Sequence, residues 1–406
     1  MNKKTLYITF DGLTDPLGQS QILPYLTGIN TNSYEITVLS CEKKEQLKSE
    51  KNTVLELIKN TNITWHYIIY DEDGGFLSRY LYLKKLGKLA KKLHAQNKFQ
   101  LIHCRSYLSS LIGLKFKLKY NIPFVFDMRG LWADERIDGG IWNKNKLLHR
   151  TFFNYFKKKE KQFIKHSNAI VSLTNNGAEE LSKLYPKVNS QQKITVIPCC
   201  CNTQLFNKDV IEKEIKLHTI SKNDHTLIYT GSIGTWYFTK EMIDCILVWK
   251  NYIPNIKLLI VTKDLEALTS ILNNYPSNIL NTIITTSSSY HNIPNYLNMA
   301  KAAIFFIKPS YSKIASSPTK MAECWAMNLP IITNAGIGDN DLYFKDNQGG
   351  ILIDGFTSFH YENACKTYLQ LNFKSNNYRN IALNYFDTNM AITKYVQIYN
   401  SLTNKN

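Results

Sequence analysis

Long apolar runs are missing from this sequence. No uninterrupted apolar stretch reaches the ~18 residues that a membrane-spanning helix needs. The apolar stretch near the N-terminus is too short for a secretory signal and meets Asp11 at once, so we expect no signal peptide there. A chain of this kind would meet a membrane only at its surface.

Cysteine patterns for metal binding are also missing. The eight cysteines form no CxxC pair and no set with histidine spacing, and Cys199, Cys200 and Cys201 are consecutive. Consecutive cysteines do not easily bridge one another, because a disulfide wants Cα atoms roughly 5.5 Å apart with suitably oriented Cβ vectors. The pattern favours a reducing, cytoplasmic compartment and predicts no metal centre.

Acidic residues are the minority charge. The 406 residues include 49 Lys and Arg against 32 Asp and Glu, a net charge of +17. Such an excess suits phosphorylated substrates, an anionic membrane surface or a polyanion, although a lysine-rich composition can also reflect codon bias. The length predicts two domains, and 44% apolar residues are ample for packed cores.

Short β-rich segments alternate with helical patterns in both halves of the chain. This alternation predicts parallel sheets covered on both faces, and hence an α/β protein of two Rossmann-like doubly wound domains facing across a cleft. The glycine fingerprint GxGxxG follows neither first strand, which disfavours NAD and FAD. The predicted strands are 5–10, 35–40, 63–70, 101–105, 123–128, 169–174 and 194–198, then 226–231, 257–263, 282–287, 302–307, 330–334 and 350–354.

A polar, lysine-rich stretch at 200–224 marks the predicted boundary. We expect domains at 1–200 and 201–386, with a final helix at about 387–406 packing back on the first domain. Ligands of doubly wound sheets bind outside the carboxyl ends of the strands. The site should therefore lie where loops follow these strands.

The segment 316–341 is the most informative part of the second half. Pro318 and Thr319 open a predicted helix that carries Lys320 and, one turn later, Glu323. The start of a helix favours phosphate, because its orphan N–H groups and the helix dipole point outward there. A lysine can neutralise a diphosphate, and a carboxylate can accept hydrogen bonds from a ribose diol. The pattern predicts a nucleotide-sugar site.

The loop after the strand 226–231 fits the same site. Gly231, Ser232 and Gly234 would let the backbone approach a phosphate, and Lys240 could reach it. An ordinary tight turn would have the same glycines, so this alternative stays open.

Two loops of the first half also follow strands. Gly18 would allow a close approach to a ligand, and Gln19 stands at a helix start. After the strand 123–128, charged side chains crowd a strand end, where an arginine can stabilise charge developing on a leaving phosphate. A capped turn and a structural ion-pair cluster are the respective alternatives. The charged residues of the second loop are Asp127, Arg129, Asp134, Glu135 and Arg136.

The segment 143–167 predicts a helix with one aromatic and one basic face. This is the pattern of a helix that lies in a membrane interface, and a core helix with a basic outer face is the alternative. Its apolar residues are Leu147, Leu148, Phe152, Phe153, Phe156, Phe163 and Ile164, and its basic ones include Lys144, Lys146, Arg150, Lys157, Lys158, Lys159, Lys161 and Lys165.

Taken together, these motifs resemble the retaining GT-B glycosyltransferases of family 4, also called group 1, and within them the bacterial polysaccharide-synthesis branch. The likeness covers nearly the whole chain. DGLTDPLGQSQILPYL and FDMRGLWADERIDGGIW resemble that branch's N-terminal loop and acceptor-side motif. VIPCCCNTQLF is similar to the family's interdomain segment, YTGSIG to the entry loop of the donor domain, and HNIPNYLNMAKAAIFFIKPS, with Ile293, to the segment near the nucleotide base.

The chain departs from the family in two places. Of the family's two glutamates separated by seven residues, Glu323 matches the second, which contacts the ribose, and Ala315 stands at the first. The family's acceptor-side histidine is missing, and Arg129 falls near its position. The family's diphosphate-binding basic residues map best onto Lys240 and Lys320.

The resemblance implies an enzyme of class EC 2.4 that moves a sugar, with retention and without a metal or other cofactor, from a UDP- or GDP-linked donor. The acceptor would be lipid-linked or a glycan, in cell-surface polysaccharide synthesis on the inner face of the cell membrane. Arg129, Lys320 and Asp127 would be catalytic, and Gln19, Asp134, Glu135 and Arg136 would line the acceptor side.

Two other classes of function stay open. A sugar-nucleotide epimerase of the same fold would need no basic aromatic helix. A non-catalytic basic binding protein would account for the charge, but the sequence has no motif that reads nucleic acid, so we expect no nucleic-acid partner.

Overall fold

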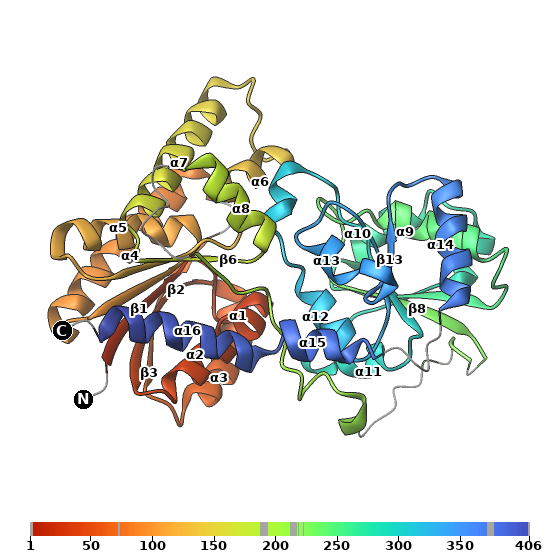
Figure 1. Cartoon of the computed structure of the whole chain (residues 1–406), viewed down its shortest axis with the longest axis horizontal. Coiled ribbons are helices and arrows are strands. Elements are labelled where there is room, and N and C mark those ends of the chain that lie inside the picture. Colours follow the sequence, from red (N-terminus) through yellow and green to blue (C-terminus); the bar gives the residue numbers. More distant parts are fainter. Residues whose placement is uncertain are drawn as a thin grey trace. The chain divides into compact units, whose positions relative to one another are not determined.

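The computed structural model describes residues 3–404 apart from 72–73, 187–193, 212–216, 218, 222 and 372–376. The chain forms two compact units, each with its own hydrophobic core (Figure 1). Unit 1 comprises Met1–Pro198, Tyr311–Ser316 and Thr388–Asn406, and unit 2 comprises Cys199–Ser310 and Ser317–Asp387.

Unit 1 is built on a seven-stranded parallel sheet in the order β3-β2-β1-β4-β5-β6-β7. The strand order reverses between β1 and β4, and such a reversal leaves a crevice at the carboxyl ends of the two strands. The strands are β1 (Lys3–Thr9), β2 (Tyr34–Lys43), β3 (Ile63–Tyr70), β4 (Leu101–Arg105), β5 (Phe124–Asp127), β6 (Ala169–Ser172) and β7 (Ile194–Val196).

Helices cover both faces of this sheet, as right-handed crossovers require. The C-terminal helix packs beside α2, opposite the face that carries α5 and α7 (Figure 1). The helices are α1 (Pro16–Gln21), α2 (Leu23–Asn30), α3 (Lys44–Ile58), α4 (Phe76–Asn97), α5 (Ser106–Tyr120), α6 (Trp132–Asp138), α7 (Leu147–His166), α8 (Asn175–Leu184) and α16 (Thr388–Thr403).

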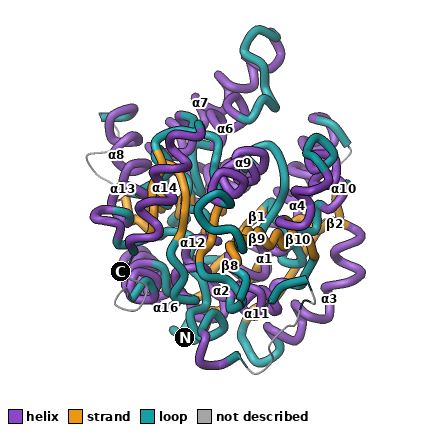
Figure 2. The backbone as a smooth tube through the Cα atoms, turned by 90° about the vertical axis from the view of Figure 1, so that its right-hand side faces the viewer, coloured by secondary structure: helices purple, strands orange, loops and turns teal. Residues whose placement is uncertain are grey.

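Unit 2 has a six-stranded parallel sheet in the order β10-β9-β8-β11-β12-β13. Its strand order reverses between β8 and β11. Figure 2 turns this unit toward the viewer and shows β8 beside β9 among the surrounding helices. The strands are β8 (His225–Thr230), β9 (Ile256–Val261), β10 (Ile283–Thr286), β11 (Ala302–Ile304), β12 (Ile331–Asn334) and β13 (Gly350–Ile353). The helices are α9 (Thr239–Trp249), α10 (Leu265–Leu272), α11 (Ile293–Leu297), α12 (Thr319–Ala326), α13 (Asn340–Tyr343), α14 (Ser358–Gln370) and α15 (Arg379–Tyr385).

The predicted fold class is confirmed: both halves are doubly wound parallel α/β structures, and every predicted strand segment coincides with a strand. Buried strands of parallel sheets are nearly continuous apolar runs, which is why the sequence marks them clearly. The division between the units lies at Pro198 and Cys199. The assignment of the halves to acceptor and donor, and a cleft between them, remain predictions.

Helix α7 combines the two alternatives considered for the segment 143–167. Phe156, Phe163 and Ile164 are buried in the core of unit 1, so these three do not belong to an exposed apolar face. Lys157 is not a free surface charge either, since its amine lies 2.6 Å from the fully buried carboxylate of Glu160 and 2.9 Å from that of Asp134. Only the first part of the helix exposes apolar side chains.

Arg379 ties the start of α15 to three other parts of unit 2. Its Nη1 donates to the carbonyl of Phe206 at 2.7 Å and to that of Ala326, and its Nη2 donates to the carbonyl of Thr203 at 2.7 Å. Arg379 thus supplies a hydrogen-bond donor to each of these three carbonyl groups. The arginine therefore holds the segment after Pro198 against α12 and α15.

We expect Arg379→Met to lower the free energy of unfolding by about 2–4 kcal/mol, because it leaves several partly buried carbonyls without a donor. Urea denaturation followed by circular dichroism measures the change. Lys366→Met, an exposed residue of α14, is the control for loss of charge. Equal urea midpoints for the two variants would contradict this role of Arg379.

Candidate functional site

The charged centre of unit 2 is Lys320, near the start of α12. Its side chain is only 8% exposed, and its amine donates to the hydroxyl of Tyr229 at 3.1 Å. The amine also lies 3.5 Å from the ring centre of Tyr237 and 4.2 Å from that of Tyr229. Tyr229 belongs to β8, beside the reversal of strand order, so Lys320 lies at the edge where ligands of such sheets bind.

The loop after β8 passes directly over this amine. Gly231 has φ +137°, a backbone conformation that strains any other residue, and a Cβ placed there would lie 2.6 Å from Lys320 Nζ and displace the amine. Gly234 has φ +106° with open space around it, and thus serves the backbone conformation alone. Two hydrogen bonds hold this loop in place. The Ile233 N–H donates to Asp264 at 2.9 Å, and the Tyr229 hydroxyl donates to the Ser232 carbonyl.

Glu323 lies one helical turn beyond Lys320 and is 7% exposed. Tyr290 donates a hydrogen bond to its carboxylate. Burial lowers the pKa of the Lys320 amine to about 7. Burial likewise raises the pKa of the Glu323 carboxyl to about 7, against the opposing effects of Tyr290 and Lys320. Both groups can therefore change charge near neutral pH when a ligand arrives.

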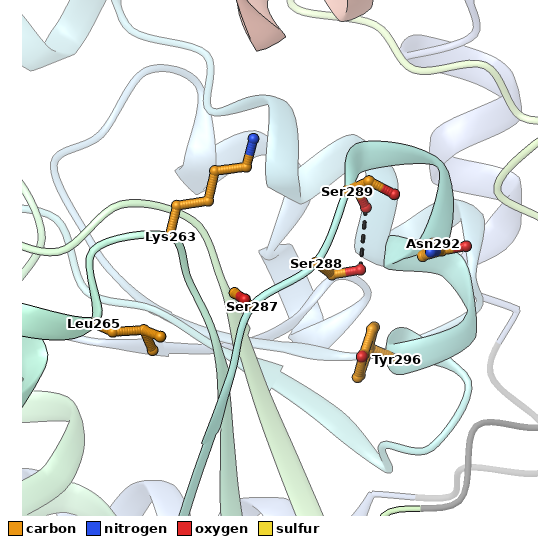
Figure 3. A pocket seen from close by; sticks show the side chains of 7 residues that line it. All are labelled: Lys263, Leu265, Ser287, Ser288, Ser289, Asn292 and Tyr296. Carbon is orange, nitrogen blue, oxygen red and sulfur yellow. Dashed lines mark hydrogen bonds between the residues drawn. The ribbon is translucent and has the colours of Figure 1, made fainter. Parts of the chain in front are cut away.

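A shallow hollow of unit 2 lies at the carboxyl ends of β9 and β10. Figure 3 shows Lys263 on one side and Ser289 and Asn292 on the other, with Ser288 donating to the Ser289 carbonyl at 3.2 Å. Tyr296 of α11 closes one end. Ile293 stands between the lining residues Asn292 and Tyr296 in sequence, so the segment predicted to approach a nucleotide base borders the hollow.

The corresponding edge of unit 1 holds two pairs of aspartate and arginine. Arg105 Nε donates to Asp11 at 3.1 Å, and Arg129 Nη1 lies 3.8 Å from Asp127 Oδ1. Arg129 has φ +59° and Ser106, directly after Arg105, has φ +67°. Left-handed backbone at non-glycine residues is costly and clusters at functional sites, and here it follows two neighbouring strands, β4 and β5.

A buried polar network lies beneath Asp127. His103 Nδ1 is 2.8 Å from the hydroxyl of Tyr399, and its Nε2 is 3.4 Å from Asp127. Tyr395 also donates to Asp127, at 3.2 Å. Burial raises the pKa of the Asp127 carboxyl, but Arg129, His103 and Arg105 outweigh it, so that this pKa is lowered overall. Burial lowers the pKa of His103, which favours the neutral ring.

The residues predicted for the acceptor side are mostly engaged within unit 1. Asp134 pairs with Lys157 at 2.9 Å, and Glu135 pairs with Lys313 at 2.8 Å. Arg136 stacks on Trp132, with 4.6 Å between guanidinium and ring centre. Gln19 donates to Glu50 at 3.1 Å. The ion-pair alternative therefore describes Asp134 and Glu135 in this state.

The structure brings Gly231, Ser232, Lys320 and Glu323 together, with Pro318 and Thr319 at the start of the same helix. Lys240 lies apart from them. Its side chain is 68% exposed and its amine is 2.6 Å from Asp244 on the outer surface of α9. The part of Lys240 in donor binding remains a prediction.

Two other predicted positions have local structural explanations. A Cβ on Gly18 would lie 2.1 Å from the carbonyl of Gly12, so this glycine is required by the packing of its own loop. Ala315, at the position of the family's first glutamate, is fully buried in unit 1, where it packs against Gly177.

Sequence reasoning missed Asp11, Arg105, Lys263 and Tyr290. Asp11 and Arg105 each end or follow a strand that borders the reversal of order, and Lys263 follows β9. The position of these three residues at or after the end of a strand could have identified them from the sequence. No sequence signal marks Tyr290, because its contact with Glu323 joins segments 33 residues apart in sequence.

Over the described ranges, no cluster of three or more His, Cys, Asp or Glu side chains could hold a metal ion. Among the helices of those same ranges, none is long and apolar enough to cross a bilayer.

Three comparisons bear on the identity of the chain. Residues 27–205 match the model of Glycosyltransferase Family 4. No curated protein matches the sequence. Among solved structures, sucrose-phosphate synthase from Thermosynechococcus elongatus is similar with a TM-score of 0.72 and 13% identity, each chain covered completely. HepE of Anabaena in complex with UDP and glucose has a TM-score of 0.69 and 12% identity, over 98% of this chain and 100% of that one.

A putative UDP-N-acetylglucosamine 2-epimerase from Listeria monocytogenes is also similar, with a TM-score of 0.63, 12% identity and coverage of 100% and 98%. At these identities the structural likeness shows the GT-B fold alone. The chain has this fold, and its residues 27–205 match glycosyltransferase family 4, a match that indicates a nucleotide-sugar-dependent glycosyltransferase.

The low pKa of Lys320 predicts proton uptake when a nucleoside diphosphate binds. The free amine loses its charge above pH 7, whereas an amine beside a diphosphate stays charged to higher pH. At pH 8 the diphosphate is already ionised, so we expect the complex to take up about one proton on binding. The affinity for the nucleoside diphosphate should then fall about tenfold for each pH unit above pH 8.

Calorimetry with UDP or GDP in buffers of different ionisation enthalpy measures this uptake. Lys320→Arg should abolish it, because a guanidinium stays charged throughout. Lys240→Arg is the matched control and should retain it. Uptake that persists in Lys320→Arg would assign the proton to another group.

Proposed function

We propose that the protein transfers a sugar, with retention, from a UDP- or GDP-linked donor to a lipid-linked or glycan acceptor in the synthesis of a cell-surface polysaccharide. One observation carries the donor assignment. Lys320 and Glu323, both buried, lie on one helix beside a loop whose Gly231 has φ +137° and passes close to the amine. This arrangement suits a diphosphate next to a ribose.

The proposed chemistry needs positioning and charge stabilisation rather than a protein nucleophile. Lys320 and the N–H group of Thr319, at the start of α12, would stabilise the leaving diphosphate. That diphosphate would help to deprotonate the acceptor hydroxyl on the same face of the sugar, which retains the configuration. Arg129, oriented by Asp127, is proposed to stabilise charge from unit 1.

The nucleoside would occupy the rest of the donor site. Glu323 would accept hydrogen bonds from the ribose diol, held in place by Tyr290. The base would lie toward the hollow that Asn292 and Lys263 line, with Ile293 at its border. HepE, whose structures contain UDP and glucose, supports a uridine donor more directly than a guanosine one.

The epimerase alternative keeps the same fold but needs no acceptor. An epimerase would interconvert free nucleotide sugars, whereas a transferase releases nucleoside diphosphate in proportion to glycosylated acceptor. The non-catalytic alternative predicts neither reaction. The match to the transferase family favours the first reading.

The proposed function is tested by incubating the protein with UDP- and GDP-sugars and a panel of alkyl glycosides. We expect product of retained configuration by NMR, and activity that persists in EDTA. Lys320→Ala should lower turnover, and Glu323→Gln should weaken nucleotide binding by ~1–3 kcal/mol, the scale of a lost charge-assisted hydrogen bond. Arg129→Ala should lower turnover and spare nucleotide binding. Free epimerised nucleotide sugar without acceptor would favour the alternative.

Attachment to an anionic membrane is the second part of the proposal. Helix α5 packs against α4 and α7 on one face of the unit 1 sheet. Within their bounds, α4 and α5 contain no acidic residue and α7 contains only the buried Glu160. The exposed basic residues of these helices are Arg79, Lys84, Lys85, Lys88, Lys91, Lys92, Lys115, Lys119, Arg150, Lys158, Lys161 and Lys165.

The start of α7 adds apolar side chains to this basic face. Leu147 is 70% exposed and Leu148 is 61% exposed, and Ile141 just before the helix is also exposed. Lys144, Lys146 and Arg150 are exposed among them. Apolar side chains flanked by basic ones are what an interfacial anchor needs, so we propose that residues 141–150 touch the membrane first.

We expect the triple change Lys144→Glu, Lys146→Glu and Arg150→Glu to weaken binding to anionic vesicles about tenfold or more, since each basic residue contributes on the order of 1 kcal/mol. Co-sedimentation at low and high salt measures it. Changing Lys157 is unsuitable, because a glutamate there would face Glu160 and Asp134. Lys301, Lys345 and Lys366, all exposed in unit 2, give a control of equal charge change. Equal binding by both triple variants, without salt dependence, would refute the anchor.

A further inference from the structure

Asp11 is an exposed carboxylate held by a buried arginine at the carboxyl edge of the unit 1 sheet. Its side chain is 41% exposed, whereas that of Arg105, 3.1 Å away, is 3% exposed. Asp11 follows β1 and Arg105 ends β4, the two strands between which the strand order reverses. The pair therefore lies where a doubly wound sheet binds its ligand.

The backbone around Asp11 is fixed as firmly as its side chain. The Asp11 N–H donates to Thr9 Oγ1 at 3.0 Å. The buried carboxylate of Glu42 accepts from the N–H groups of Leu13 at 2.8 Å and Thr14 at 3.1 Å. A carboxylate that is accessible and yet pre-oriented in this way is suited to bind a ligand, because little freedom remains to be lost on binding.

The Arg105 guanidinium has more around it than this one ion pair. Burial and Arg129 lower its pKa, but Tyr7, Asp11 and Asp127 outweigh them, so that the pKa is raised overall. Arg105 Nη1 is, moreover, a buried donor for which the described residues provide no acceptor. Lys4 and Glu35 form a simpler pair in the same unit, 3.7 Å apart with both side chains exposed, and they serve below as a comparison.

We propose that Asp11 binds hydroxyl groups of the acceptor sugar, with Arg105 as the positioning residue that holds its carboxylate. This inference rests on the proposed transferase function and adds the acceptor subsite to it. The carboxylates expected on the acceptor side, Asp134 and Glu135, are tied to Lys157 and Lys313. Asp11 has only the buried Arg105 as an ion-pair partner among the described residues, and keeps an exposed edge.

The chemistry of the pair favours a sugar hydroxyl over an anionic group. An ionised carboxylate only accepts hydrogen bonds, and a hydroxyl donates them. A phosphate or uronate next to Asp11 would meet a like charge, because Arg105 is already paired with it. Removing the negative charge should thus weaken the binding of a hydroxyl ligand and tighten the binding of an anionic one.

The test is saturation-transfer NMR on the full chain with UDP present and a panel of octyl glycosides of glucose, galactose, mannose and N-acetylglucosamine. We expect wild-type protein to bind at least one member, and Asp11→Asn to bind it at least tenfold more weakly. UDP affinity by calorimetry should stay unchanged in this variant. Glu35→Gln, which removes an exposed paired carboxylate elsewhere in the same unit, should bind both ligands like the wild type.

Arg105 is tested by rescue. Arg105→Gln should weaken glycoside binding while sparing UDP, and Arg105→Lys should restore part of it. If Arg105→Gln does not fold, the glycoside affinity of Asp11→Asn still tests the proposed subsite. Unchanged or tighter glycoside binding in Asp11→Asn overturns the subsite, and so does a wild type that binds no glycoside of the panel. The transferase function is judged separately, by UDP binding and by donor turnover, and would survive either result.

Discussion

Both units bury charged side chains at the carboxyl edge of a parallel sheet, and this burial shapes everything around them. A buried charge is tolerated only when partners compensate its lost hydration. The surrounding loops and aromatic rings can therefore be understood as the means by which each sheet keeps a cation at the position where its strand order reverses.

The two units compensate the buried cation in different ways. In unit 1 the cations are arginines, which stay charged, and each lies beside an aspartate: Arg105 with Asp11 and Arg129 with Asp127. In unit 2 the cation is Lys320, surrounded by the rings of Tyr229 and Tyr237 rather than by a close carboxylate. The arginines of the first arrangement stay charged, whereas the second arrangement leaves room for an incoming anion to supply the missing countercharge.

The strands and the helix that carries Lys320 and Glu323 could be predicted from the sequence, because apolar runs and the spacing of these two residues are local properties. The pairing of Lys240 with Asp244 was not predicted, since a position on a helix alone does not say which partner the side chain finds. The partners of Asp134 and Glu135 could not be predicted, because Lys157 and Lys313 reach them from other elements. Asp11 and Arg105 lie 94 residues apart, and only the pairing of β1 with β4 brings them together.

The sequence pattern also did not tell which apolar side chains of 143–167 are buried. Apolar periodicity marked 143–167 as two-faced, but did not show that Phe156 and Phe163 belong to the core while Leu147 and Leu148 are exposed. The exposure of the apolar side chains changes along the helix as well as around it, and periodicity measures only the change around it.

The depressed pKa of Lys320 has a chemical consequence beyond binding. An amine that is largely unprotonated just above neutral pH is a nucleophile. Lys320 is thus disposed to form a Schiff base with a small aldehyde, and a phosphorylated aldehyde would combine that reactivity with the anion preference of its surroundings. The same burial that makes the cation costly to keep would make this one amine chemically distinguishable from the many others in a highly basic protein.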